Sequence, residues 1–435
     1  MPTITTYPKS GPPGTSVTCI GSGFAKKQAG AVTFGGTKVG AFRTAGNGSF
    51  SIMFSVPVVD AGIKTVLART STTSGQTTFT VEKISIPEPP IPEPPVPEPI
   101  PPNTNFPIPT TGIIVGASLT AAQVQALINN SPAESVFLWE DRSSVFDAFI
   151  TPKSGNKHYA KTPRGAILLG GGFTGYGGET GQHDILIQGF VLENRTGRPL
   201  KCGWRWTLND IEARNSIIGV DLNNGCRVNG GRWHHNAQYA FAGGPTTDIM
   251  IDGLEWDNNN PSGVDDGDRG GCKIVGSSQG TTFVTVQRCH VHHNGAHGIW
   301  FDWANKDILY LNNYVHDNGG CGIFHEASDR AVIRDNRVEY NMVNVDPTKS
   351  IWYGSEIYLN DSSNVEILNN YVKARTHGIC GTDSDRGSGL YGELMLCNVV
   401  VHDNVIVAGS GHRLHYLTNR TNPCGGTPWK EYANS

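Results

Sequence analysis

Two neighbouring stretches of the sequence, Cys289-His-Val-His-His-Asn-Gly-Ala-His-Gly-Ile-Trp-Phe-Asp302 and Asn313-Tyr-Val-His-Asp-Asn-Gly-Gly-Cys-Gly-Ile-Phe-His-Glu326, share one pattern. In each stretch a short apolar strand ends in Asn, a glycine-rich corner follows, and a second strand begins with Gly-Ile. Asparagines at strand ends mark the same repeat along much of the chain: Asn194, Asn215, Asn236, Asn258, Asn294, Asn318 and Asn341, with later repeats starting at Asn336, Asn370 and Asn404. A repeat of this kind decides the fold before any single motif does.

The usual spacing between these asparagines is about 22 residues, which suits one turn of a parallel β-helix with three short strands per coil. Leucine-rich repeats have a similar length, but their leucine pattern is absent from this sequence. An asparagine at a coil corner tolerates left-handed backbone angles and can hydrogen-bond its equivalent in the next coil. We therefore predict an all-β solenoid in which the asparagine column is structural and not a ligand site.

With these repeats, the chain resembles the right-handed parallel β-helix family, which includes pectate-lyase-like enzymes and phage tailspikes. The stretches Ala126-Leu-Ile-Asn-Asn-Ser-Pro132 and Gly322-Ile-Phe-His-Glu326 also resemble a widespread branch of that family. The resemblance covers most of the chain after residue 110 and implies the fold. No catalytic signature of pectate lyases or polygalacturonases can be carried over residue by residue, so the resemblance does not specify a reaction.

The first part of the chain, residues 1–83, contains short β-rich runs such as Ser49–Val56 and Thr77–Val81 between glycine and proline turns. This pattern predicts a sandwich of about seven strands. The phrase Ser10–Phe24 resembles the immunoglobulin-like modules of bacterial and phage surface proteins, which implies an anchoring or spacer role. No catalytic motif lies in this part.

The proline- and glutamate-rich repeat at residues 84–109 predicts an extended polyproline II linker. A ligand for an SH3-like domain is the alternative interpretation, although the repeated Glu suits solvation better. After the linker, the β-helix is predicted over residues 110–435, with a capping helix near residues 118–129. Ser118 or Thr120 is the candidate N-cap of that helix.

Composition excludes several classes of function. The formal net charge is −4 and no Lys/Arg run is present, which argues against nucleic-acid binding. No apolar run approaches the length of a membrane span. The N-terminus lacks the features of a secretory signal, so we expect either a removed signal or release with a virion upon cell lysis. The nine cysteines contain no CxxC pair and are expected to be buried thiols or, alternatively, to form one or two disulfides between coils.

Aligning the strands that follow the asparagine corners separates inward from outward positions. The second column of the alignment is continuously apolar and is therefore predicted to point into the core: Val220, Cys272, Ile299, Ile323, Ile357 and Ile379. Because side chains alternate along a strand, the third and fifth columns should point outward. The third column contains Asp221, Lys273, Trp300, Phe324 and Tyr358, and the fifth contains Asn223, Val275, Asp302, Glu326 and Asn360.

The outward aromatic residues of the third column, Trp300, Phe324 and Tyr358, predict a stripe that suits sugar rings, with Asp221 and Asn360 as polar partners. A different interpretation is that a loop covers the aromatic residues, so that they form a second small core. The two interpretations differ in whether these rings are exposed.

Asp302 and Glu326 are neighbours on adjacent coils, so their carboxyl groups are expected about 5 Å apart. One pKa of such a pair should rise, which places an acid beside a base at the separation used by retaining glycosidases. Lys273 could neutralise a uronate carboxylate or act as a lyase base. His325 stands in a nominally inward column and is either a core histidine or turned toward the acids. The alternative for the whole group is a solvated, salt-bridged face.

Two weaker predictions concern metal sites. His234, His292 and His316 each precede a corner residue by two positions and could stack as a polar ladder or bind a metal. The acidic residues Asp265, Asp266 and Asp268 share one loop and could bind Ca²⁺, although their spacing is not that of an EF-hand. No cofactor is required by the sequence.

Together these features predict a surface-displayed protein that binds a polysaccharide or cell-surface glycan. It could also cleave that glycan, as a polysaccharide lyase or glycoside hydrolase. The order of module, linker and β-helix resembles a bacteriophage virion protein of the tailspike, head-fibre or decoration type, attached to capsid or tail proteins through residues 1–83. The alternatives are a non-catalytic capsid decoration or adhesin, and a secreted lyase or hydrolase. Homo-oligomers are compatible with all three.

Overall fold

The computed structural model describes residues 2–57, 59–82, 106–146, 148–175, 180–264, 267–344, 355–418, 424 and 428–435. The chain forms two compact units, Met1–Pro92 and Glu93–Ser435. The predicted polyproline linker falls largely on residues 83–105, which lie outside the described residues.

The first unit consists of two β-sheets around a phenylalanine-rich core. One sheet contains β1 (Thr3–Tyr7), β3 (Ser16–Ser22) and β6 (Phe50–Ser55). The other contains β2 (Ser10–Gly11), β8 (Ser74–Val81), β7 (Gly62–Thr70), β4 (Ala29–Phe34) and β5 (Thr37–Arg43). Alternation along β3 buries Val17 and Cys19 and exposes Ser16 and Ile20. The immunoglobulin-like assignment of this unit stays a prediction.

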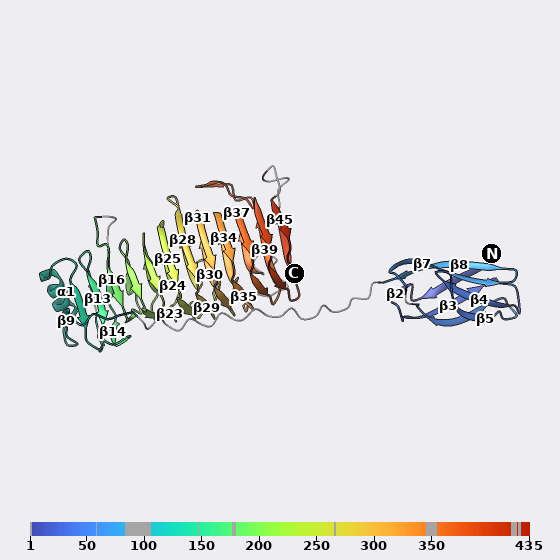
Figure 1. Cartoon of the computed structure of the whole chain (residues 1–435), viewed down its shortest axis with the longest axis horizontal. Helices are drawn as coiled ribbons and strands as arrows, with labels where there is room; N and C mark the ends of the chain where they lie inside the picture. The colour runs from blue at the N-terminus through green and yellow to red at the C-terminus, as the bar shows by residue number, and fades with distance from the viewer. Residues whose placement is uncertain are drawn as a thin grey trace. The chain divides into compact units, whose positions relative to one another are not determined.

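The second unit is a solenoid of three long parallel sheets, which the chain visits in the same order in every coil (Figure 1). Among the described residues, sheet 1 has thirteen strands and sheets 2 and 3 have eleven each. Sheet 1 contains β9 (Ile113–Val115), β10 (Val136–Trp139), β13 (Lys157–Ala160), β16 (Leu186–Gln188), β19 (Thr207–Asn209), β22 (Arg227–Asn229), β25 (Thr247–Asp252), β28 (Thr281–Gln287), β31 (Asn305–Leu311), β34 (Asp329–Arg334), β37 (Ser363–Leu368), β42 (Val399–His402) and β45 (Trp429–Tyr432).

Sheet 2 contains β11 (Arg142–Val145), β14 (Ala166–Leu169), β17 (Phe190–Glu193), β20 (Glu212–Arg214), β23 (Arg232–His234), β26 (Glu255–Asp257), β29 (His290–His292), β32 (Tyr314–His316), β35 (Arg337–Glu339), β38 (Tyr371–Lys373) and β43 (Val405–Val407). Sheet 3 contains β12 (Phe149–Ile150), β15 (Gly172–Thr174), β18 (Leu200–Lys201), β21 (Ile218–Leu222), β24 (Tyr239–Gly243), β27 (Cys272–Val275), β30 (Ile299–Asp302), β33 (Ile323–Glu326), β36 (Ser355–Asn360), β39 (His377–Asp383) and β44 (Leu414–Thr418). The hairpin strands β40 (Ser388–Gly389) and β41 (Gly392–Glu393) lie outside the three sheets.

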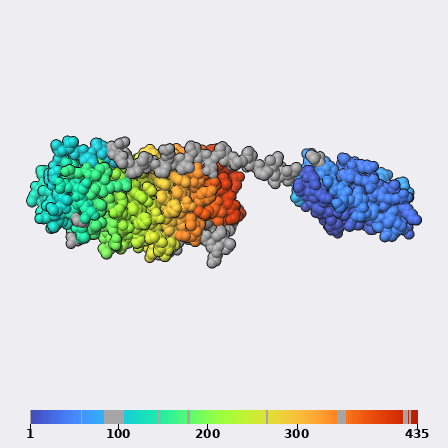
Figure 2. Space-filling view, turned by 90° about the horizontal axis from the view of Figure 1, so that it is seen from below, coloured from blue at the N-terminus to red at the C-terminus, as the bar shows by residue number. Residues whose placement is uncertain are grey.

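The coils stack in sequence order. In Figure 1 the strands of the solenoid follow one another from β9, beside helix α1 (Ala121–Asn130), to β45. On the face shown in Figure 2, the colours of the solenoid likewise run in the order of the sequence. Each coil therefore packs against the coils before and after it, which makes the stabilising contacts local in sequence.

The predicted inward column is confirmed. Ile299, Ile323, Ile357 and Ile379 are paired in register along sheet 3 and are completely buried. Val220 and Cys272 belong to the same core, and Phe241 of β24 fills the column between them. The inward and outward faces of sheet 3 are thus as the sequence predicts.

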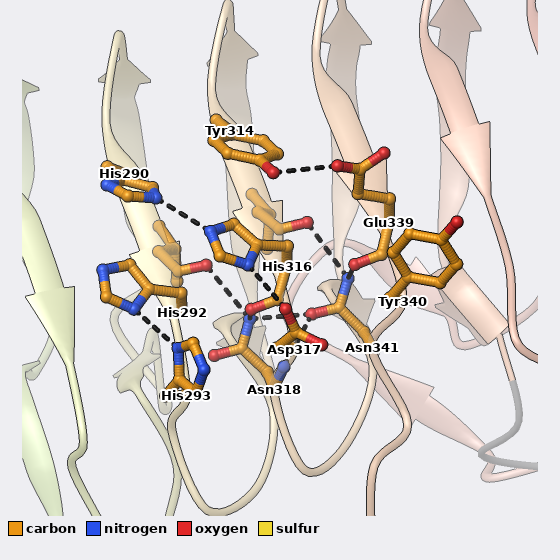
Figure 3. A network of polar contacts seen from close by, with 12 residues as sticks. His290, His292, His293, Tyr314, His316, Asp317, Asn318, Glu339, Tyr340 and Asn341 are labelled. Carbon is orange, nitrogen blue, oxygen red and sulfur yellow. Dashed lines mark hydrogen bonds and ion pairs between the residues drawn. The ribbon is translucent and has the colours of Figure 1, made fainter. Parts of the chain in front are cut away.

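Asparagine side chains connect the coils at the corner between sheets 2 and 3. The backbone N–H of Asn318 donates to Oδ1 of Asn341 at 3.0 Å, and Nδ2 of Asn318 donates to the same oxygen at 2.7 Å and to the Val291 carbonyl at 3.2 Å (Figure 3). The ladder continues through Asn236, Asn259, Asn294, Asn318 and Asn341. A second ladder at the corner between sheets 1 and 2 joins Asn313, Asn336, Asn370, Asn404 and Asn434.

At two positions the predicted asparagine column is wrong by one residue. Asn215 and Asn258 do not belong to the ladder; Ser216 and Asn259 occupy those rungs. Asn215 and Asn258 instead adopt left-handed backbone angles, with φ of 48° and 51°, just before the rung. In other coils this left-handed position is occupied by several residue types. An asparagine at that position therefore resembles a ladder residue in the sequence but makes none of the ladder's hydrogen bonds.

A glycine directly precedes the sheet 3 strand in the repeat, because the neighbouring ladder leaves no room for a side chain at that position. A Cβ built on Gly322 would lie 2.5 Å from Cγ1 of Val338 and 2.7 Å from Nδ2 of Asn341. The Gly-Ile pair in the repeat is therefore a packing requirement of the ladder.

A helix covers the first coil. Helix α1 (Ala121–Asn130) begins after the N-cap Thr120, whose side chain accepts from the Gln123 backbone while the Gln123 side chain accepts from the Thr120 backbone. Val124 and Ile128 are fully buried in the solenoid core. The helix thus closes the open end of the core, as the terminal repeat of a solenoid must. The described residues contain no helix with the length and hydropathy of a membrane span.

We predict that residues 106–435 fold without the first unit. Their contacts are between adjacent coils, so the fragment should unfold in a cooperative transition with β-rich circular dichroism. Thermal and urea unfolding followed by circular dichroism tests this. An insoluble fragment would contradict the division into independent units.

Replacing Ile323 with Asp should lower the free energy of unfolding by about 4 kcal/mol or more, because an unpaired carboxylate enters a packed interior. The matched control is Leu309→Asp, which makes the same kind of change at a position that is 36% exposed on sheet 1. Urea unfolding should show a large loss for the first variant and a small one for the second. Equal losses would contradict the inward assignment of this column.

Candidate functional site

Two carboxyl groups lie side by side at the end of sheet 3. Asp302 ends β30, Glu326 ends β33, and the two residues are paired in register on these parallel strands. Adjacent strands are about 4.8 Å apart, so the register brings the two carboxyl groups close together. The side chains are 16% and 12% exposed, which leaves a narrow approach to both.

Lys273 on β27 holds Asp302. Its ammonium nitrogen Nζ lies 3.1 Å from Oδ2 of Asp302, donates to the Gly267 carbonyl at 2.5 Å, and sits 3.8 Å from the centre of the Trp300 ring system. All three contacts use the group as a donor or a cation. Lys273 is therefore arranged as a charge partner of Asp302 rather than as a base.

Glu326 is held by two donors. Nε1 of Trp300 donates to its Oε2 at 3.0 Å, and Nη1 of Arg386 lies 2.5 Å from its Oε1. Burial, followed by the charge of Asp302, raises the pKa of Glu326 even though Arg386 and Trp300 favour the ionised form. Glu326 consequently keeps its proton to a higher pH than an ordinary glutamic acid.

Oδ1 of Asp302 is buried and accepts no hydrogen bond within the described part of the chain. A buried carboxylate oxygen without a donor is costly and calls for an explanation. An acid that holds its proton therefore lies beside a carboxylate with an open acceptor, an arrangement that can carry acid–base chemistry.

A cavity lies near the strand ends that carry these acids, although neither Asp302 nor Glu326 lines it. It has a volume of 160 Å³ and includes Ala327 and Ser328, which directly follow Glu326 in the chain. The insertion that carries β40 and β41 covers it with Leu390, Tyr391 and Glu393.

The predicted exposed aromatic stripe is wrong. Trp300, Phe324 and Tyr358 point away from the main core, as the strand alternation predicts, but their exposed fractions are 3%, 1% and 0%. They form a second small core with Cys321, Met342 and Cys380. The ring of His297 also packs on Trp300 and Phe324. These aromatic faces are not available to a sugar in this structure.

The remaining residues of the predicted site are dispersed. His325 is fully buried, with Nδ1 3.0 Å from the Tyr310 hydroxyl, and burial lowers its pKa to about 3; of the two alternatives, the core histidine is confirmed, and His325 does not turn toward the acids. Asp221 pairs with Arg198 at 2.8 Å two coils upstream of Lys273. Asn360 is buried and accepts from the Ser384 hydroxyl. Of the predicted catalytic residues, the structure thus brings together Lys273, Asp302 and Glu326.

Of the predicted calcium ligands, Asp265 and Asp266 lie outside the described residues. The side chain of Asp268 is 85% exposed, 4.0 Å from Nζ of Lys273, and accepts from the Tyr239 hydroxyl at 3.4 Å. It adds negative charge near Lys273. All nine cysteines are free thiols, eight of them buried.

The predicted histidine column lies on the outward face of sheet 2. The rings of His292 and His316 stack with centres 5.1 Å apart and an interplanar angle of 10°. His290 on the same face stacks against Tyr314 at 5.2 Å, and its Nε2 lies 2.9 Å from Nε2 of His316 (Figure 3). Burial, and then the neighbouring His292 and His316, lower the pKa of His290 to about 4. His234 belongs to the same column two coils earlier.

Two features of the surface escape prediction from the sequence. Arg386 reaches Glu326 from an insertion 60 residues later in the chain, and only the unusual length of that coil signals it. A groove of 490 Å³ runs over the outward face of sheet 1, past the exposed Phe283 and Leu309 and the ion pair of Asp307 with Arg330. Asp248, Phe283, Asp307, Arg330 and Asn364 all have positive φ, so a row of left-handed residues shapes this groove.

The match to a protein-family model lies within the second unit. The family model of the right-handed beta helix region matches residues 200–355. The A-module of the mannuronan C-5 epimerase AlgE4 of Azotobacter vinelandii is 14% identical with a TM-score of 0.52, over 72% of this chain and 96% of that module. The catalytic unit of a GH87 α-1,3-glucanase of Streptomyces thermodiastaticus is 10% identical with a TM-score of 0.53, over 100% of this chain and 88% of that unit. Comparison of the sequence with curated proteins gives no match. The family match and the three-sheet coil together show that the second unit is a right-handed parallel β-helix.

Proposed function

We propose that the β-helix binds a polysaccharide and hydrolyses it at the acid pair Asp302 and Glu326. The observation that carries the proposal is the register pairing of these carboxyl groups, with the pKa of Glu326 raised by burial and by Asp302. Two carboxyl groups in different environments can divide the roles of acid and base.

In the proposed reaction, protonated Glu326 donates its proton to the glycosidic oxygen as the bond to the leaving sugar breaks. The carboxylate of Asp302 attacks the anomeric carbon and forms a glycosyl–enzyme intermediate. Water then releases the sugar, with Glu326 accepting a proton from that water. The spacing of adjacent strands, about 4.8 Å, is near the separation of about 5 Å that retaining enzymes use.

The charges around the pair favour an acidic glycan. Lys273 and Arg386 place an ammonium and a guanidinium group within 3.1 Å and 2.5 Å of the two acids. A uronate carboxylate that approached the cavity would meet these cations. The engagement of Lys273 as a charge partner favours hydrolysis over β-elimination, which needs a base. The two proteins of the same fold named above, a mannuronan epimerase and an α-1,3-glucanase, act on polysaccharides, which supports a polysaccharide substrate in general.

The setting we propose is the surface of a bacteriophage virion, with the first unit attached to capsid or tail proteins. The order of a separate β-sheet unit, a proline-rich segment and a solenoid supports this. The second candidate function is a non-catalytic adhesin or capsid decoration. The cation that pairs with each acid favours both, and the burial of Trp300, Phe324 and Tyr358 favours the decoration, which needs no glycan.

Glu326→Gln should lower the rate of cleavage at least about 100-fold, because it removes the proton donor and keeps the shape of the side chain, while glycan binding persists. Wild-type protein is first screened against acidic and neutral polysaccharides, with reducing ends and unsaturated uronates measured together. The matched control is Glu193→Gln, which alters an ion-paired acid on the outward face of sheet 2. Binding without cleavage by the wild type supports the adhesin. A wild type that neither binds nor cleaves contradicts both the hydrolase and the adhesin and leaves only the capsid decoration.

The pH profile of cleavage should follow Glu326. Since the raised pKa keeps Glu326 protonated, the rate should be high below that pKa and fall as the pH rises through it. In Arg386→Gln the falling limb should move to higher pH, because the guanidinium group that favours the ionised form is gone. Initial rates across a pH series measure this. An unmoved limb would exclude Glu326 as the proton donor.

A further inference from the structure

A second group of potential ligands lies on the outward face of sheet 2, away from the acid pair. One nitrogen of His290, one nitrogen of His292 and one carboxylate oxygen of Glu255 all lie within 4.8 Å of one another. All three residues are partly exposed, so an ion could reach them from solvent.

The sheet itself brings these ligands together. His290 and His292 flank the fully buried Val291 on β29, so alternation places both imidazoles on the outward face. Glu255 on β26 is paired in register with His290, and Asp257 with His292. The ligands therefore stand on two hydrogen-bonded strands and not on loops, which limits how far they can separate.

We propose that Glu255, His290 and His292 bind a divalent transition-metal ion of the zinc class. Imidazole nitrogens suit Zn²⁺, Cu²⁺ and Ni²⁺, whereas Ca²⁺ and Mg²⁺ prefer oxygen ligands. Two histidines and one glutamate form a three-ligand set that leaves one position for water or a fourth group.

Hydrogen bonds outside the triad already orient the rings (Figure 3). Nδ1 of His292 lies 2.8 Å from Nδ1 of His293, which gives Nδ1 a partner when Nε2 turns to a metal. Nε2 of His292 lies 3.2 Å from Oε1 of Glu255. A proton shared by this nitrogen and this oxygen occupies the place that a metal ion would take.

His316 is the candidate for the fourth position. Its Nδ1 lies 2.9 Å from the carboxylate of Asp317, which must accept, so Nδ1 carries the hydrogen and Nε2 presents a lone pair. That Nε2 is 2.9 Å from Nε2 of His290. A carboxylate bound to the far nitrogen of a ligand histidine is the usual arrangement around protein-bound zinc.

The distances require only a small contraction. Ligand atoms around a tetrahedral zinc ion with bonds of about 2.0–2.1 Å are about 3.4 Å apart. The pair His292–Glu255 already meets this distance, at 3.2 Å. The nitrogen of the partly exposed His290 lies within 4.8 Å of these two atoms, so its approach completes the set.

The local charge favours a cation. Glu255 and Asp257 contribute two negative charges and Arg232 one positive charge, so the sum is negative. Arg232 donates to both oxygens of Asp257, at 2.8 and 2.7 Å, and stands 3.5 Å from Glu255. Asp257 thus holds the guanidinium group in hydrogen bonds, and Arg232 makes only the longer contact to Oε1 of Glu255, the oxygen that also faces His292.

The same column contains a natural control. His234 faces Glu212 at 3.4 Å, in the geometry of His292 and Glu255. Two guanidinium groups also contact Glu212: Arg214 at 2.5 Å and Arg164 at 3.6 Å. Arg232 stands where a second imidazole would be needed. This pair should therefore bind no metal ion.

A metal ion in the triad would join two neighbouring coils. Any ligand that binds only the folded state raises the stability of that state. Metal binding should therefore raise the melting temperature of the solenoid.

The test uses the full chain without a histidine tag, freed of metals by a chelator. Zn²⁺ is titrated in competition with a chromophoric chelator, and Co²⁺ binding is followed by its visible absorption bands. We expect one tight equivalent of each ion, a rise in melting temperature, and no such rise with Ca²⁺ or Mg²⁺. The double variant His290→Ala/His292→Ala and the single variant Glu255→Gln should each weaken the site by at least about 100-fold, whereas His234→Ala should not.

Glu255→Gln keeps the size of the side chain, so its loss of binding cannot be ascribed to misfolding if its metal-free melting temperature matches the wild type. Wild-type protein that binds no equivalent of Zn²⁺ or Co²⁺ would overturn the proposal. So would binding that survives the double variant, or binding that His234→Ala removes equally.

Discussion

The hydrogen bond from the backbone of each coil corner to the asparagine side chain of the next coil is the interaction on which the solenoid depends. At these corners the chain leaves one sheet for another, and its buried N–H groups have no strand partner. Asn294, Asn318 and Asn341 supply that partner through their Oδ1 atoms and donate with Nδ2 to a carbonyl of the coil before. The last rung is Glu356, which accepts both donors of Asn341; burial raises the pKa of this carboxyl group to about 8. A buried polar group is tolerated only when satisfied, and the ladder satisfies a whole column at once.

Because the corners are in register, so are the outward residues between them. A carboxylate on one coil falls beside a carboxylate on the next, as at Asp302 and Glu326, and an imidazole falls beside an imidazole, as at His292 and His316. In an isolated strand these residues would be separate surface groups. The solenoid turns a spacing of one coil in sequence into direct contact, so its sites are rows of residues that share a column.

This relation explains which parts could be predicted from the sequence. Columns are visible in an alignment of the repeats, so the inward isoleucines and the pairing of Asp302 with Glu326 could be predicted. What covers a column is not visible there. Met342 and His297 pack over the aromatic residues from corners of the solenoid, and the alignment of one strand gives no sign of them. Arg386 could not be predicted for the same reason, because it arrives from an insertion that belongs to no column.

The ladders also determine where the molecule can change over evolutionary time. Successive rungs are joined across 23 or 24 residues in some coils and across 34 or 35 in others, with the same hydrogen bonds of 2.7 to 2.9 Å. A rung thus fixes the register between two coils whatever the number of residues that separates their corners. Added sequence can enter between two rungs without displacing a strand. The insertion that carries Arg386 is such an addition, and new specificities can be acquired on this scaffold by lengthening a coil, at little cost to the fold.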